Sequence, residues 1–154
     1  MNAGISIDRL KASLVMEEGR VLNPYKCPAG KKTIGVGHNI DAKGLPDFIE
    51  FYLSQHGEIT DEMSDYLLDL DVQDAVEATV KLFSQAAWGW LTQKRREVLV
   101  EMTFNMGSLN EWHHLIASVE QHDLDGCIQS MQTSLWHRQL PERSNRLIEK
   151  FRKG

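Results

Sequence analysis

Apolar residues recur at helical intervals over most of the chain. Leu10 and Leu14 lie one helical turn apart and share the apolar face of a predicted helix over residues 6–18. A longer helix is predicted over residues 60–82, which contain neither Gly nor Pro, and Thr60 is placed to cap its first turn. The same spacing predicts further helices over residues 93–106, 111–121 and 124–133, and a last one from Pro141 to about residue 151.

A segment rich in Gly and Pro, residues 23–44, interrupts this helical pattern. Residues 33–38 (Thr-Ile-Gly-Val-Gly-His) are typical of a short strand, and the Pro-Ala-Gly sequence at residues 28–30 supplies a turn before it. The segment therefore predicts a small β-hairpin.

Together these elements predict an α+β fold, mainly α, with two lobes in one domain over residues 1–154. The small α/β lobe covers about residues 15–60, and a connecting helix follows over about residues 60–82. The helical lobe covers about residues 83–154 together with the N-terminal helix. We expect a cleft between the two lobes in which a polymer can lie.

Composition and charge narrow the function. Of 154 residues, 42% are hydrophobic and 25% charged, as in folded soluble proteins, and no apolar run approaches the roughly 20 residues that span a bilayer. Residues 1–18 lack the apolar stretch of a signal peptide, so we expect the protein to start in the cytoplasm, without stable membrane insertion. The net charge of −5 argues against nucleic acid as a partner. Two cysteines are too few for a disulfide framework, and the histidines show no ligand spacing, so neither a metal nor a cofactor is expected.

The predicted hairpin places a thiol near a hydroxyl. If its turn centres on Gly30, Cys27 lies directly opposite Thr33, and the two side chains can hold one small molecule such as water. Alternation along residues 33–38 puts Thr33 and two glycines on one face and His38 with two apolar residues on the other. A face with so little side-chain bulk lets a sugar chain approach the backbone, although the glycines can equally serve only to relieve a bend.

Glu17 and Glu18 end the first predicted helix at the edge of its apolar face. A carboxyl group pressed against apolar neighbours keeps its proton to higher pH, as a general acid requires. Helical periodicity does not choose between the two residues, and both can also be solvated glutamates at a helix end.

Several motifs together resemble the active-site segment of the T-even phage lysozymes and related endolysins. That family is marked by Glu, eight residues, Asp or Cys, five residues and Thr, and this chain has Glu18, Cys27 and Thr33 at that spacing. Glu18-Gly19, Tyr25, Gly30 and the whole of residues 33–38 belong to the same pattern. The resemblance continues through Arg95-Arg96, Phe104-Asn105-Met106-Gly107 and the C-terminal set Trp136, Gln139, Pro141, Arg143 and Arg146, whereas residues 42–57 match poorly.

The resemblance implies roles for three catalytic residues. Glu18 would donate a proton to the glycosidic oxygen, and Cys27 and Thr33 would flank the opposite face of the sugar, where water or an enzyme nucleophile attacks. A thiol with an ordinary pKa near 8.5 is mostly uncharged at neutral pH, so Cys27 cannot stabilise positive charge at the sugar as Asp would. It can still position water, or attack if its pKa is depressed.

The resemblance also implies substrate-binding residues. His38 would support the site from the opposite face of the strand. Arg143 would lie near the catalytic acid and set its charge environment. Asn39, Phe104 and Asn105 would line the substrate cleft.

The expected function is that of an endolysin: a muramidase that hydrolyses the β-1,4 bond between N-acetylmuramic acid and N-acetylglucosamine in peptidoglycan and so lyses the host cell. We expect a monomer that accumulates in the host cytoplasm, depends on a holin, and then acts in the periplasm and cell wall. The acidic net charge is at odds with an anionic wall polymer as substrate.

Two other functions fit parts of the pattern. A cysteine hydrolase would use Cys27 as nucleophile and His38 as base to cut amide bonds of the same wall. Strand alternation argues against it, because His38 points away from the face that carries Thr33. A non-catalytic wall-binding protein would keep the fold after losing the usual Asp.

Overall fold

The computed structural model describes residues 3–154 and contains a mainly helical α+β fold, which confirms the predicted fold class. The chain divides into two compact units, one formed by the chain up to Leu10 with residues 74–154 and the other by residues 11–73. Two helices, α1 (Ile7–Glu18) and α4 (Asp61–Val80), begin in one unit and end in the other. Thr60 caps α4 as predicted, since its hydroxyl accepts a hydrogen bond from the Met63 amide at 3.1 Å.

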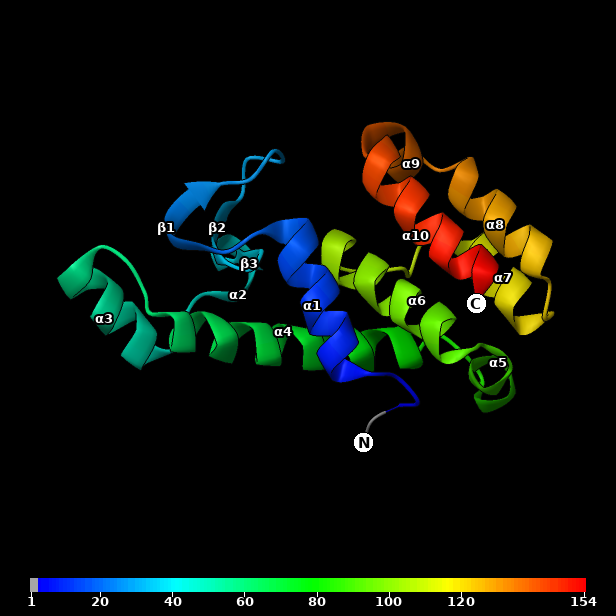
Figure 1. Ribbon diagram of the computed structural model, residues 1–154, viewed down its shortest axis with the longest axis horizontal. Helices are drawn as coiled ribbons and strands as arrows, with labels where there is room; N and C mark the ends of the chain where they lie inside the picture. Colours follow the sequence, from blue (N-terminus) through cyan, green and yellow to red (C-terminus); the bar gives the residue numbers. More distant parts are fainter. Residues whose placement is uncertain (1–2) are drawn as a thin grey trace. The chain divides into compact units, whose positions relative to one another are not determined.

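The unit of residues 11–73 contains the sheet. Strands β1 (Val21–Lys26), β2 (Lys32–Gly35) and β3 (His38–Asn39) pair antiparallel in that order. Two helices follow the sheet along the chain, α2 (Ile40–Lys43) and α3 (Asp47–His56) (Figure 1). The core of this unit is a cluster of buried aliphatic side chains, namely Ile34, Ile49, Ile59 and Leu67.

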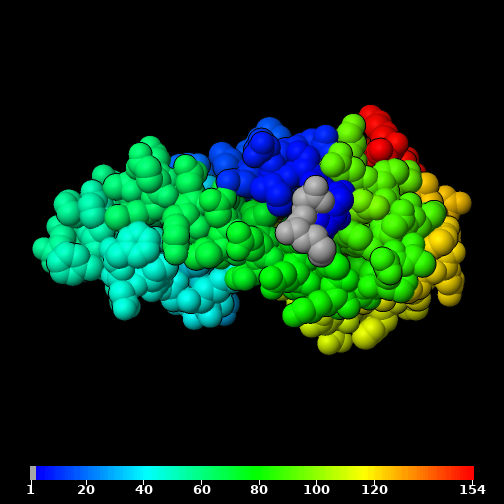
Figure 2. Space-filling view, turned by 90° about the horizontal axis from the view of Figure 1, so that it is seen from below, coloured from blue at the N-terminus to red at the C-terminus, as the bar shows by residue number. Residues whose placement is uncertain are grey.

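The outer surface of this unit is partly aromatic. Helices α3 and α4 form much of the surface seen in Figure 2. Phe48 and Tyr66 meet edge to face with their ring centroids 5.3 Å apart, and both are exposed.

The other unit is a helical bundle. Its helices are α5 (Gln85–Trp90), α6 (Gln93–Met106), α7 (His113–Glu120), α8 (Leu124–Gln132), α9 (Leu135–Gln139) and α10 (Pro141–Lys153). Every residue of α6 from 97 to 103 is buried, so this helix forms the centre of the bundle. Side-chain N-caps begin four of the helices, from Ser84, Thr92, Asp123 and Ser134. Cys127 and Trp136 are buried in the core, and Trp88, Trp90 and Trp112 pack against it, as expected of core side chains.

One local expectation needs correction. The segment of residues 33–38 is not one strand, because the chain turns after Gly35 and returns as β3, with Ile34 opposite His38. Gly35 and Gly37 both have positive φ (65° and 66°), a conformation that glycine adopts without strain and that forms this turn. Residues 42–57, which match the lysozyme pattern poorly, contain α3 and the second half of α2.

Candidate active site

The turn between β1 and β2 sets the geometry of the site. Cys27 accepts a hydrogen bond from the Gly30 amide at 2.8 Å, and its own amide donates to the Lys31 carbonyl at 2.9 Å. Gly30 has φ +80°, so the loop of residues 28–30 is a three-residue hairpin loop that ends in a left-handed glycine. Its centre is Ala29, and the register assumed from Gly30 is therefore wrong: Cys27 faces Lys31.

Cys27 and Thr33 nevertheless meet. Tyr25 lies directly opposite Thr33, and Cys27 is the next residue on the same face of β1, diagonal to Thr33. The Thr33 hydroxyl lies within hydrogen-bond reach of two acceptors, the Lys31 carbonyl oxygen at 2.8 Å and the Cys27 sulfur, and donates its one proton to either of them. The predicted pairing of thiol and hydroxyl thus holds, through a diagonal contact.

The surroundings of Cys27 favour its thiolate. A backbone hydrogen bond from Lys31 is the largest influence and lowers the pKa of the thiol; partial burial opposes it, and hydrogen bonds from Ala29 and Thr33 add to the lowering. The net pKa lies below the ordinary value, so Cys27 is a better nucleophile and water-orienting group than an unperturbed thiol.

Glu18 ends α1 and lies against the turn that follows β2. A Cβ atom placed on Gly37 would come within 3.2 Å of the Glu18 carboxyl carbon. Glycine is favoured at residue 37 by its φ of +66°, and a larger residue there would also press on the Glu18 carboxyl group. This contact between a half-buried carboxyl group and a glycine backbone distinguishes Glu18 from a freely solvated glutamate at a helix end.

Tyr25 is a member of the site that the candidate residues above omit. Partial burial raises the pKa of its phenol, and the negative charges of Glu18 and Cys27 raise it further. The phenol therefore lies within electrostatic reach of both groups and stays protonated. The signal was present in the sequence, since residues 25 and 27 share one face of a strand.

His38 is buried on the other face, opposite Ile34. Its Nδ1 lies 2.7 Å from Oδ2 of Asp71, and its Nε2 lies 2.8 Å from the Gly44 carbonyl oxygen. Both neighbours are acceptors, so both ring nitrogens donate and the imidazole is charged. Burial lowers the pKa of His38, but the hydrogen bonds to Asp71 and Gly44 outweigh it, and the net pKa is raised.

Asp71 completes this buried group. Its second oxygen, Oδ1, lies 3.0 Å from Nζ of Lys43, and its side chain is as buried as that of His38. Because His38 and Asp71 are 33 positions apart, no local pattern in the sequence pairs them.

The remaining predicted residues fall into two groups. Asn39 lies opposite Thr33 in the sheet and caps α2, accepting a hydrogen bond from the Ala42 amide at 3.0 Å. Phe104, Asn105 and Arg143 belong to the other unit and are partly buried there. Asn105 accepts a hydrogen bond from the Trp136 indole at 3.1 Å. Their placement in a common substrate cleft with the sheet residues stays a prediction.

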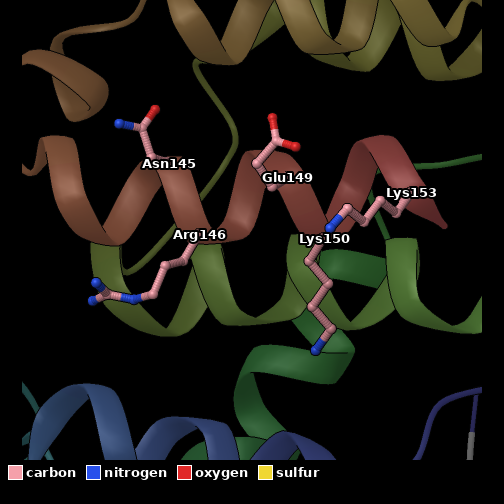
Figure 3. Close-up of a pocket in the computed structure, with 5 residues that line it drawn as sticks. All are labelled: Asn145, Arg146, Glu149, Lys150 and Lys153. Carbon is pink, nitrogen blue, oxygen red and sulfur yellow. The ribbon is translucent and has the colours of Figure 1, made fainter.

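Other sites find little support in the described residues. Among residues 3–154, no group of three or more His, Cys, Asp or Glu side chains is arranged to hold a metal ion, and no helix is long and apolar enough to cross a membrane. A shallow hollow of about 490 Å³ follows α10 (Figure 3). It is lined only by polar and charged side chains, and none of them is a predicted site residue: Asn145, Arg146, Glu149, Lys150 and Lys153.

Comparison with known proteins finds matches over most of the chain. The family model for phage lysozyme matches residues 16–151. Two relatives from Dictyostelium discoideum, described as probable T4-type lysozyme 2 and probable T4-type lysozyme 1, are 27% and 26% identical to the chain. Each alignment covers 96% of this chain and 96% of the relative.

Proposed function

The chain belongs to the phage lysozyme family and is a glycosidase of the lysozyme type, and from this premise we propose that it is an endolysin that hydrolyses the β-1,4 bond between N-acetylmuramic acid and N-acetylglucosamine. Peptidoglycan is the substrate that the family implies. Lysis of a host cell is the biological role that we propose for this cleavage.

The observation that carries the proposal is the grouping of Glu18, Tyr25, Cys27 and Thr33 around one hairpin face. Glycosidases need an acid on the leaving-group side and a second group at the anomeric carbon. Glu18 supplies the acid and protonates the glycosidic oxygen. Cys27 and Thr33 hold the water that attacks the anomeric carbon, or the thiolate attacks it directly, and the anomer of the first product distinguishes these two routes.

The test is the release of reducing sugar from purified peptidoglycan by matched variants. Wild type and Cys27→Asp are expected to release reducing ends, and Glu18→Gln is expected to lose nearly all activity. Glu17→Gln, the same change one residue earlier on α1, is the control and should keep most of the activity. No release by wild type, or equal losses in the two Gln variants, would contradict the assignment.

The cysteine hydrolase is disfavoured by His38. Its two ring nitrogens already donate to Asp71 and Gly44, so it has no lone pair with which to accept a proton from Cys27. Release of free amino groups from peptidoglycan, abolished by alkylation of Cys27, would overturn this reasoning.

The role in lysis has its own test. We propose that the protein accumulates in the host cytoplasm as a monomer and reaches the periplasm and wall through a holin. Expressed alone, it should lyse cells only after the membrane is permeabilised, and it should elute as a monomer in size-exclusion chromatography. Lysis without membrane damage would exclude holin dependence.

A further inference from the structure

The charges of the chain are unevenly distributed. The unit of residues 11–73 has six Lys or Arg against eleven Asp or Glu and carries the whole net charge of −5, whereas the other unit, with eleven of each, is neutral. Within the acidic unit, however, the stretch from residue 19 to residue 40 contains no acidic residue. Three of its basic residues, Lys26, Lys31 and Lys32, lie at the hairpin tip and are exposed; we call them the lysine tip.

The lysine tip is arranged at a cost in stability. Lys26 and Lys32 are direct partners across β1 and β2, and like charges at such positions repel each other. Within residues 3–154 no ion pair involves any of the three ammonium groups. The carboxylate that approaches the tip, that of Asp41, accepts a hydrogen bond from the backbone amide of Lys32 at 2.9 Å. The hairpin tip thus has three positive charges without ion-pair partners in the described part of the chain, and they contribute no stability to the fold.

The lysine tip also adjoins the reacting groups. Lys31 faces Cys27 across the turn and lies two residues before Thr33, so it belongs to their face of the hairpin. Lys26 and Lys32 project from the reverse face of the same two-stranded ribbon. Lys31 can therefore reach a bound polymer directly, and the other two add to the positive potential around it.

We propose that the lysine tip is an electrostatic subsite for the carboxylates of the peptides attached to the glycan strand. The inference rests on the proposed function and deepens it, because it names the part of peptidoglycan that the hairpin binds. It also explains how an acidic protein acts on an anionic polymer. The attractive charge is concentrated beside the site, and most of the acidic residues lie elsewhere on the unit. Lysine suits this role as a flexible point charge that accepts carboxylates in many orientations.

The first experiment compares charge-matched variants on two substrates. The triple variant Lys26→Gln, Lys31→Gln and Lys32→Gln is set against a control with the same charge change at exposed lysines of the other unit, Lys81→Gln, Lys94→Gln and Lys153→Gln. The substrates are peptidoglycan freed of phosphate polymers, and the same glycan stripped of its peptides. The lysine-tip variant should lose about tenfold in kcat/KM on intact peptidoglycan at low salt, mainly through KM. It should lose less than twofold on the stripped glycan, and added salt should shrink the difference.

The second experiment separates this role from a structural one. Lys26→Glu places an opposite charge across from Lys32, on the strand that does not contact Asp41, so it should raise Tm while it lowers kcat/KM on intact peptidoglycan. A structural role for the lysine tip would move Tm and activity in the same direction, and that result would overturn the proposal.

Cosedimentation with both polymers makes the outcome independent of turnover. If wild type cleaves neither polymer, the proposed function fails, and binding still tests the lysine tip. Equal losses of binding and kcat/KM in the lysine-tip and control variants would show an effect of overall charge. Equal losses on both substrates would show that the lysines do not bind the peptides. Either result overturns the proposal. Binding that is restored only by adding phosphate polymers back to the wall would assign the lysine tip to phosphate and overturn it as well.

Discussion

Replacing His38 by Gln removes the imidazolium charge from the buried pair of His38 and Asp71, whose carboxylate also contacts the exposed ammonium group of Lys43. The imidazolium donates two hydrogen bonds, at 2.7 Å to Asp71 and at 2.8 Å to the Gly44 carbonyl. The His38 and Asp71 side chains are each only 5% exposed, so solvent screens the pair little. A hydrogen bond with a charged group contributes about 1.5–3 kcal/mol, and a Gln amide restores one neutral bond of about 1 kcal/mol. The expected loss is about 3 kcal/mol; the ammonium group of Lys43 keeps Asp71 partly compensated and holds the cost at the low end for a broken buried pair.

The loss should depend on pH in a defined direction. The pKa of folded His38 is raised above its ordinary value of 6.5. The stability that its charge contributes is therefore fully present below about pH 6.5 and disappears as the pH rises through the folded pKa. The difference between wild type and His38→Gln should be largest near pH 6 and should shrink as the pH rises through the folded pKa of His38.

Urea unfolding followed by far-UV circular dichroism is the appropriate assay. The four Trp residues lie within residues 88–136, in the unit that does not contain His38, so tryptophan fluorescence reports on the wrong part of the chain. His56→Gln is the matched control, because His56 is exposed and contacts Tyr52 of its own helix, through a hydrogen bond to the carbonyl and a stacked ring. It should cost less than about 0.5 kcal/mol. A loss under about 1 kcal/mol for His38→Gln at pH 6, or one that does not change with pH, would refute the reasoning.

Three further predictions concern the hairpin. Burial raises the pKa of Cys127 to about 12, whereas the pKa of Cys27 is lowered. Iodoacetamide at pH 8 should therefore label Cys27 alone in the folded protein, as mass spectrometry of its peptides would reveal. Labelling of Cys127 at the same rate would contradict this. Gly37→Ala should lower stability by about 1–2 kcal/mol, because it strains a residue at φ +66°. It should lower activity at least tenfold, because it displaces the Glu18 carboxyl group. Unchanged peptidoglycan cleavage would be incompatible with the site. Tyr25→Phe keeps the ring and removes the hydroxyl, so it should reduce kcat/KM about two- to tenfold with Tm within a few degrees, and wild-type kinetics would exclude the phenol from the site.

Much of the helical part of the fold could be predicted because its signals are local. Thr60 followed by twenty helix-forming residues specifies α4, and Pro141 at the first position of α10 specifies where the last helix begins. The helices α2, α5 and α9 escaped, because four to six residues are too few to show a period. Helix α3, with ten residues, was not predicted either.

The site could be predicted only in part, because its geometry depends on turns and distant contacts. Placing the hairpin centre at Gly30 in place of Ala29 shifted the register, and the contact between Cys27 and Thr33 survived because the two residues still share one face. The alternation of side chains along residues 33–38 is the same whether the strand continues or folds back. The sequence pattern therefore did not reveal the turn. His38 lies on β3 and its partner Asp71 lies on helix α4, which only tertiary structure brings to it.

The side on which Cys27 projects has a consequence for how such a site changes during evolution. Cys27 is half-buried on one face of a two-stranded ribbon, while Ile34 and His38 hold the opposite face in the interior. An exchange of thiol for carboxylate at this position alters the reaction at the sugar and leaves the interior contacts intact. Descendants of one ancestral gene can therefore pass between the two chemistries by single substitutions, each intermediate remaining a folded protein on which selection can act.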